Sequence, residues 1–179
     1  MNKINRLAIF CGSKKGSNTL YAQHAAELGK IIADKKIELI YGGGRNGIMG
    51  VAADTVMKHC GIVRGVIPQV LIEWEHQHEG ISELVVVEDM HVRKRRMYEL
   101  CDAAIILPGG FGTLDELFEM LTWNQLSIHD KEIFILNSGG FYDHLLAHLN
   151  HLSKEGFLYA NPEDEIIVLS EPKEIIDYL

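Results

Sequence analysis

The clearest structural signal in this chain is Pro108-Gly109-Gly110-Phe111-Gly112-Thr113-Leu114-Asp115-Glu116. An apolar run, residues 103–107, precedes it, and an amphipathic stretch over 114–126 follows. This order predicts a strand, a glycine turn and the start of a helix. Glycines let the backbone turn sharply and approach a ligand closely, and the N–H groups at the start of a helix favour an anion, usually a phosphate. The segment therefore predicts a phosphate site between a strand and a helix.

One carboxylate of this segment, Glu116, has two interpretations. We expect it in the first turn of the helix, beside the phosphate site without belonging to it, where it could act on a phosphorylated molecule. In the alternative, Thr113 caps the helix while Asp115 and Glu116 complement the helix dipole. Glu116 taken alone fits the alternative better, but the neighbouring glycines favour a role in chemistry.

Short apolar runs alternate with helical patterns along the whole sequence. We expect strands at 7–11, 37–41, 62–67, 83–87, 103–107, 132–136 and 166–169. We expect helices at 20–33, 48–59, 91–101, 114–126 and 142–152, and a terminal helix that starts at Pro172. Apolar strands that alternate with helices are typical of a parallel sheet covered on both faces. The sequence thus predicts an α/β fold, a doubly wound, mostly parallel Rossmann-like sheet with helices on both faces, in a single domain over residues 1–179.

Three turns that contain glycine follow three of these strands, namely Gly12-Ser13, Gly42-Gly43-Gly44 and the turn at 109–112. Because ligands of such sheets bind outside the carboxyl ends of the strands, we expect the three turns to meet at one edge. The stretch 41–50 lacks both the dinucleotide-binding fingerprint and the Gly-Lys-Ser/Thr of a nucleotide-hydrolysing loop. Its glycines leave two interpretations open, a ligand site and a tight turn that packs closely on a helix.

A run of four cations, residues 93–96, stands out because the chain is acidic, with a formal net charge of −8. On a helix, Arg93 and Arg96 would share a side, while Lys94 and Arg95 would diverge. Charge alone favours a solvated helix face, above all for Arg95. Arg93 or Lys94 could instead reach a phosphate or a carboxylate, since arginine presents forked donors to such groups.

Composition limits the classes of function. The net charge argues against general nucleic-acid binding, and no apolar run approaches the length of a membrane span. The three cysteines, Cys11, Cys60 and Cys101, are scattered along the chain, which suits a reducing compartment. No basic and apolar leader precedes the first strand. We therefore expect a soluble cytoplasmic protein without a nucleic-acid or membrane partner.

The histidines give little support for a metal site. The most polar stretch, residues 73–80, is expected to form a loop or lid and holds one pair at a chelating spacing, His76 and His78. No His-Glu-x-x-His motif or cysteine pair accompanies it, so we expect no metal. His144, His148 and His151 recur at helical spacing and are interpreted as a polar or packing face. The Gly-x-Ser-x-Gly elbow of serine hydrolases is absent.

Two motifs together resemble a known family. Met90-His91-Val92-Arg93-Lys94, followed by the segment at 108–116, resembles the Lonely Guy family of cytokinin-activating phosphoribohydrolases, which are often mislabelled as lysine decarboxylases. The likeness runs through nearly the whole chain and includes residues 10–13, 41–44, 65–68, 122–126 and 128–131. Departures from the usual pattern fall at Arg45-Asn46, Phe111 and Asp115.

The resemblance implies an activity and a set of residues. It implies hydrolysis of the N-glycosidic bond in a nucleoside 5′-monophosphate with an N6-modified adenine, which releases the free base and ribose 5-phosphate without a cofactor, by a protein that is usually a homodimer. The implied catalytic residues are Arg93 and Glu116. The implied substrate contacts are Gly43, Gly44, Glu75, Met90, Lys94, Gly109, Gly110, Gly112, Thr113 and Thr122.

The chemistry of these residues is compatible with that activity. Cleavage of a glycosidic bond builds positive charge on the sugar, which a carboxylate such as Glu116 can stabilise. Arg93 could hold the carboxylate, bind the phosphate or assist the departing base. Two alternatives stay open: a nucleotide or cofactor carrier without catalysis on the same fold, and a pyridoxal-phosphate lysine decarboxylase that uses Lys94 as its Schiff-base lysine.

Overall fold

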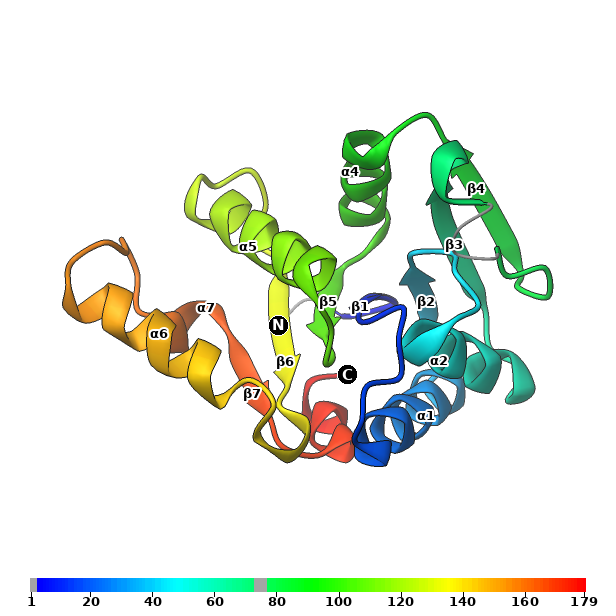
Figure 1. Ribbon diagram of the computed structural model, residues 1–179, viewed down its shortest axis with the longest axis horizontal. Helices are drawn as coiled ribbons and strands as arrows, with labels where there is room; N and C mark the ends of the chain where they lie inside the picture. Colours follow the sequence, from blue (N-terminus) through cyan, green and yellow to red (C-terminus); the bar gives the residue numbers. More distant parts are fainter. Residues whose placement is uncertain (1–2, 73–76) are drawn as a thin grey trace.

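The computed structural model describes residues 3–72 and 77–179, and it contains one seven-stranded sheet (Figure 1). The strand order is β4-β3-β2-β1-β5-β6-β7, and each neighbouring pair is parallel. The strands are β1 (Arg6–Phe10), β2 (Glu38–Tyr41), β3 (Val63–Pro68), β4 (Glu83–Val87), β5 (Ala103–Ile106), β6 (Glu132–Leu136) and β7 (Ile167–Leu169). The predicted α/β class and the parallel sheet are confirmed.

Helices cover both faces of the sheet, as predicted. One face carries α1 (Thr19–Asp34), α2 (Gly47–Lys58) and η3 (Pro172–Tyr178), and the other carries α4 (Met90–Leu100), α5 (Phe111–Gln125) and α6 (Asp143–Lys154). Shorter elements are η1 (Gln69–Leu71), η2 (Ser138–Gly140) and α7 (Pro162–Glu165). Strand β1 shows why two cores form, because alternate side chains point to opposite faces. Leu7 and Ile9 join the first core, and Ala8 and Phe10 join the second.

The boundaries differ from the prediction mainly at the helix after β5. Helix α5 begins at Phe111, three residues before the expected start, so the glycine turn runs directly into the helix. Glu116 is therefore the sixth residue of α5 and not part of its first turn, which contains no acidic residue. Gly110 is the N-cap residue, and Thr113 does not cap the helix. Both corrections weaken the interpretation of Glu116 as a dipole partner, since the dipole effect fades beyond the first turn.

Other differences are small. Strand β3 includes Pro68, which we expected to stop it, since a proline at a strand end needs no N–H donor there. The terminal helix begins at Pro172 as predicted but is a 3₁₀ helix. The short helix α7 was not predicted, because four residues are too few to show a periodicity. In the described parts of the chain, no helix has both the length and the apolar character that crossing a membrane requires.

The sheet places a crevice beside β1. After β1 the chain adds β2, β3 and β4 on one side, and β5 then pairs on the other side of β1. The strand order reverses at this point, and in open α/β sheets ligands bind outside the carboxyl ends of the strands at such a reversal. The fold therefore directs attention to the turns that follow β1 and β5.

Candidate active site

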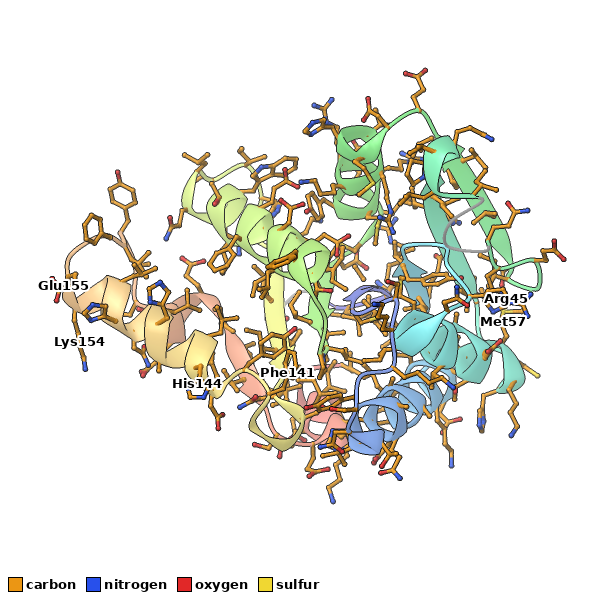
Figure 2. All side chains as sticks on the ribbon, viewed as in Figure 1. Arg45, Met57, Phe141, His144, Lys154 and Glu155 are labelled. Atoms are coloured by element: carbon orange, nitrogen blue, oxygen red, sulfur yellow. The ribbon has the colours of Figure 1, made fainter. Side chains whose placement is uncertain are left out.

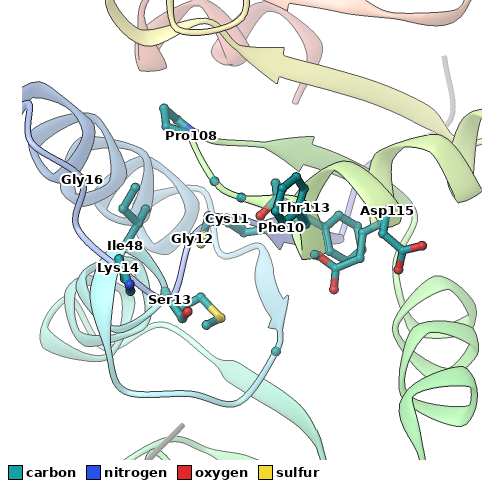
Figure 3. A pocket seen from close by; sticks show the side chains of 18 of the residues that line it. Phe10, Cys11, Gly12, Ser13, Lys14, Gly16, Ile48, Pro108, Thr113 and Asp115 are labelled. Atoms are coloured by element: carbon teal, nitrogen blue, oxygen red, sulfur yellow. The ribbon is translucent and has the colours of Figure 1, made fainter. Parts of the chain in front are cut away.

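A cavity of about 420 Å³ lies at these strand ends (Figure 3), a size typical of small-molecule sites. All three predicted glycine turns contribute to its wall, through Gly12, Gly42 and the segment 109–112. Backbone hydrogen bonds join the turns, since the Gly12 N–H donates to the carbonyl of Pro108 at 3.0 Å and the Gly12 carbonyl accepts from Ile48 N–H at 3.1 Å. The prediction that the turns meet at one edge is confirmed.

The start of α5 is open toward this cavity. The first N–H groups of any helix lack partners within the helix, and the Gly110 N-cap offers no side chain to accept from them. By contrast, Asn18 caps α1, and Asp89 caps α4 with bonds of 2.8 Å from the N–H groups of His91 and Val92. A Cβ atom added at Gly110 or Gly112 would meet no atom within 4 Å. The N-terminal end of α5 therefore has both hydrogen-bond donors and room for an anion.

Gly109 is tightly packed, unlike its two neighbours. A Cβ atom there would overlap the hydroxyl of Thr113 and would lie 3.0 Å from the amide nitrogen of Gly12. The absence of a side chain at Gly109 thus allows the turn after β5 to close against the turn after β1. Thr113 itself is buried and lines the cavity.

Arg93 enters the cavity from α4 on the opposite side. Its side chain is buried, its Nη2 donates to the Gly42 carbonyl at 3.0 Å, and its Nε donates to the Val66 carbonyl at 3.1 Å. A Cβ atom at Gly42 would overlap the guanidinium group. The first glycine of the triple-glycine turn is therefore required for this position of Arg93, a role that the sequence did not reveal.

The other members of the cationic run show where the sequence interpretation was right and wrong. Arg95 is exposed, as expected for a solvated face. Arg96 does not share the buried side of Arg93, because it is exposed and pairs with Glu99 at 3.3 Å. The buried side of α4 includes both Arg93 and Lys94, and Arg96 lies on its exposed side.

Glu116 is buried and lines the cavity from α5, beside the exposed Asp115. Cys11 lies at the end of β1 in the same wall. Burial, and to a lesser extent the charge of Glu116, raises the pKa of the Cys11 thiol far above its ordinary value. Cys11 therefore stays a thiol at neutral pH and is not a nucleophile. The carboxylate of Glu116 and the guanidinium of Arg93 remain as the candidates for chemistry.

Comparisons with known proteins agree on a family. A family model described as possible lysine decarboxylase matches residues 49–179. The cytokinin riboside 5′-monophosphate phosphoribohydrolase LOG1 of Arabidopsis thaliana is 42% identical over 178 residues, which cover 99% of this chain and 84% of that protein. The cytokinin riboside 5′-monophosphate phosphoribohydrolase of Rhodococcoides fascians is 43% identical over 166 residues, which cover 92% of this chain and 84% of that protein. The chain belongs to the Lonely Guy family.

A solved structure shares the fold of this Lonely Guy protein at low identity. The Moco carrier protein of Chlamydomonas reinhardtii superposes with a TM-score of 0.74 and 17% identity, over 98% of this chain and 95% of that one. This likeness concerns the fold alone, because fold does not fix function.

The structure brings together seven of the site residues that the Lonely Guy resemblance implied. The residues that line the cavity are Met90, Arg93, Gly109, Gly110, Gly112, Thr113 and Glu116. Others in the described part of the chain lie outside its lining, namely Gly43, Gly44, Lys94 and Thr122. Glu75 and His76 lie outside the described residues. The arrangement does not test whether any of these residues contacts a substrate, so their substrate roles stay predictions.

The residues outside the lining have other partners. The Gly43 carbonyl accepts from the His78 N–H at 3.0 Å, and Gly44 forms a β-bridge with Gln77. The Thr122 hydroxyl donates to the Phe118 carbonyl at 2.7 Å, on an exposed side of α5. Local sequence placed these residues on the right elements, but it did not show which way each one faces.

Several cavity residues of this Lonely Guy protein were not predicted. Lys14 follows the predicted Gly12-Ser13 turn after β1 and adds a cation to the wall (Figure 3). Phe141 after η2, which Figure 2 labels, forms an edge-to-face ring pair with Tyr21 of α1, with centroids 5.4 Å apart, and both residues line the cavity. These two aromatic residues are 120 positions apart in the sequence, so only the tertiary fold brings them together.

The structure shows the positions of four of the histidines considered above, namely His78, His144, His148 and His151. His144, which Figure 2 labels, is exposed on α6 together with His148 and His151, so the three form a polar face as expected. His78 binds Asp54 through Nε2 at 3.0 Å. Among the residues that the structure describes, no group of three His, Cys, Asp or Glu side chains is arranged to hold a metal ion.

Proposed function

We propose that the protein hydrolyses the N-glycosidic bond of adenosine 5′-monophosphates that carry an N6-modified adenine, and releases the free base and ribose 5-phosphate. The observation that carries this proposal is that one cavity holds the buried Glu116 and Arg93 and also opens onto the uncapped start of α5. The names of the Arabidopsis and Rhodococcoides relatives, which are more than 40% identical over nearly the full chain, support it.

The start of α5 binds the 5′-phosphate in this proposal. Its first N–H groups and the positive end of the helix dipole favour an anion, and the bare faces of Gly110 and Gly112 let the phosphate approach the backbone. Lys14 lies in the wall of the same cavity and supplies a positive charge in an otherwise acidic protein. Binding the phosphate fixes the sugar, and such fixed geometry is a large part of catalysis.

Glu116 faces the reaction centre from the second turn of the helix that binds the phosphate. Its carboxylate stabilises the positive charge that develops on the sugar as the base departs. Arg93 is held by two carbonyl groups, from Gly42 and Val66, so its guanidinium group is fixed in place before the substrate arrives. From this position it orients the carboxylate or assists the departing base.

The two alternatives have less support. A carrier needs no buried acid beside its phosphate site, and the carrier protein with the same fold is only 17% identical. A pyridoxal-phosphate decarboxylase needs a lysine that loses its proton readily. Burial alone would lower the Lys94 pKa, but hydrogen bonds from Lys94 to Asp115 and Glu119 outweigh that effect and raise it. Lys94 thus remains a protonated ammonium group, which is unsuited to forming an imine.

The proposal extends to assembly and compartment. Phe118 and Thr122 lie one turn apart on an exposed side of α5, and the exposed Leu126 and Ile128 follow just beyond the end of the helix. An exposed apolar strip of this kind suits a contact with a second copy of the chain, in a homodimer. The three cysteines are free thiols, which suits the cytoplasm.

The first prediction concerns Glu116. Purified wild-type protein incubated with isopentenyladenosine 5′-monophosphate should release free base, which chromatography detects, and AMP should serve as a second substrate. Glu116→Gln should lower kcat by about 100-fold or more, because the amide cannot stabilise the sugar cation. An exposed carboxylate on the neighbouring helix offers a control, since Glu99→Gln should leave kcat unchanged.

Two results would count against this function. If Glu116→Gln turns over at a near-normal rate, the carboxylate is not part of the chemistry. If the wild type binds the nucleotide but releases no base, the carrier alternative is correct. Nucleosides without phosphate should be poor substrates, because the start of α5 then has no anion to hold.

A further inference from the structure

Lys94 connects the two helices that carry Arg93 and Glu116. Its Nζ lies 3.0 Å from Oδ2 of Asp115 and 3.1 Å from Oε2 of Glu119, while only 9% of its side chain is exposed. Asp115 and Glu119 are one turn apart on α5, so a single ammonium group on α4 bridges two carboxylates of the facing helix.

Tyr98 adds a second connection one turn further along α4. Its hydroxyl donates to Oε2 of Glu119 at 2.8 Å, and its ring packs edge-to-face on Trp123 of α5, with centroids 5.1 Å apart. Burial, followed by the hydrogen bond to Glu119, raises the Tyr98 pKa well above its ordinary value, so the hydroxyl keeps its proton and stays a donor. Lys94 and Tyr98 therefore hold Glu119 from two consecutive turns.

The contacts of Lys94 and Tyr98 with Asp115 and Glu119, here called the tether, lie next to the proposed catalytic pair in the sequence. Lys94 directly follows Arg93, and Asp115 directly precedes Glu116, so the ion pair joins the chain neighbours of the two proposed catalytic residues. Short links join α4 to β4 before it and to β5 after it, and Arg93 lies in its first turn. Lys94 therefore adds a side-chain bond to α5 directly beside the turn of α4 that carries Arg93.

The charges of the cluster also argue against a phosphate contact by Lys94. One ammonium group and two carboxylates leave the cluster with a net negative charge. A phosphate that approached Nζ would face both carboxylates at short range. Lys14, which lines the cavity and for which no such carboxylate pairing is seen in the described part of the chain, is better placed for that contact.

We infer that Lys94 is a positioning residue, which sets Arg93 on α4 and Glu116 on α5 at their working separation through Asp115, Glu119 and Tyr98. The inference rests on the proposed function for its effect on turnover, but not for its effect on binding. It differs from the substrate contact that the family resemblance implied for Lys94.

The test uses the full chain and four variants: Lys94→Met, Lys94→Arg, Glu119→Gln and Tyr98→Phe. Lys94→Met should lower kcat by about 10- to 100-fold with KM for the nucleotide nearly unchanged, because small misplacement of reacting groups is costly. Lys94→Arg should recover most of kcat, since arginine can also bridge two carboxylates. Glu119→Gln should reproduce the defect of Lys94→Met, and the double variant should be no worse than either single one. Tyr98→Phe should show a smaller defect of the same kind.

A direct substrate contact would produce the opposite pattern. Lys94→Met would then raise KM for the monophosphate by about 10-fold or more with kcat preserved, and Glu119→Gln would be nearly silent. Either of these results overturns the inference. If Lys94→Met does not fold, Lys94→Arg and Glu119→Gln still separate the two patterns.

A calorimetric titration with AMP keeps this test separate from the proposed function. If the wild type releases no base, the proposed function fails, but the role of Lys94 can still be decided. A positioning residue leaves the Kd for AMP within about 2-fold in Lys94→Met, whereas a phosphate contact raises it by about 10-fold. A raised Kd overturns the inference whether or not the protein is active.

Discussion

Two glycine turns of this protein have similar sequences and different surroundings. The turn at 42–44 follows β2, and its first two glycines are packed against protein, with the Arg93 guanidinium at Gly42 and the side chains of Ile67 and Leu84 at Gly43. The turn at 109–112 follows β5, and two of its glycines, Gly110 and Gly112, face open space. Glycine serves close packing in the first turn and access for a ligand in the second.

The sheet order explains this difference. Strand β2 lies between β1 and β3, and the chain at 77–78 returns to pair with the turn that follows β2. Strand β5 lies where the strand order reverses, so the turn after it borders the crevice. A glycine-rich turn can therefore pack against a catalytic side chain or leave its backbone open to a ligand, depending on the position of the preceding strand in the sheet.

Among substitutions that test the comparison of the two turns, the largest effect is expected at Gly42, because this packed turn holds Arg93 in place. Gly42→Ala places a methyl group where the Arg93 guanidinium lies, so Arg93 must leave its two carbonyl partners. We expect kcat to fall by about 100-fold. Stability should change little, because the displaced atoms are the far end of a flexible side chain. Steady-state kinetics and thermal unfolding of the same samples measure both effects.

A double-mutant cycle tests whether this loss passes through Arg93. If Gly42→Ala acts only by displacing the guanidinium group, the double variant with Arg93→Ala should be no slower than Arg93→Ala alone. Additive losses would mean that Gly42 affects the cavity in some other way. A normal rate for Gly42→Ala would show that Arg93 does not need this position.

The sequence was sufficient for the sheet, the helices on both faces and the edge at which the turns meet. These follow from periodicity and from glycines at strand ends, which are local signals. It was not sufficient for the packing of Gly42 on Arg93, which joins residues 51 positions apart. Which side of α4 is buried also depends on the elements that pack against it. For this reason the prediction that Arg96 shares the side of Arg93 was wrong. The start of α5 was predicted three residues too late because Gly112, the second residue of the helix, has a low helix propensity and looked like part of the turn.

A smaller effect is expected at Lys14, which would add charge to the open turn. Lys14 lines the cavity, whereas its neighbour Lys15 is exposed outside the cavity lining, so the two lysines form a matched pair. Lys14→Gln should raise KM for the monophosphate by about 10-fold, equivalent to about 1.4 kcal/mol, with kcat nearly unchanged. Lys15→Gln should match the wild type. Equal effects from both substitutions would indicate only a general attraction of the anion, which added salt would suppress.

The smallest effect is expected at Gly112, where the open turn and the helix have opposite requirements. Gly112 is the second residue of α5, and alanine is favoured over glycine in helices by roughly 0.5–1 kcal/mol. Because a Cβ atom there meets no protein atom within 4 Å, Gly112→Ala should raise Tm by about 1–3 °C. The same methyl group should raise KM for the nucleotide by about 3-fold, since it occupies the path of the phosphate. A variant that is more stable and binds as well as the wild type would show that the phosphate does not approach α5 at Gly112, and that this glycine is present for a reason other than access.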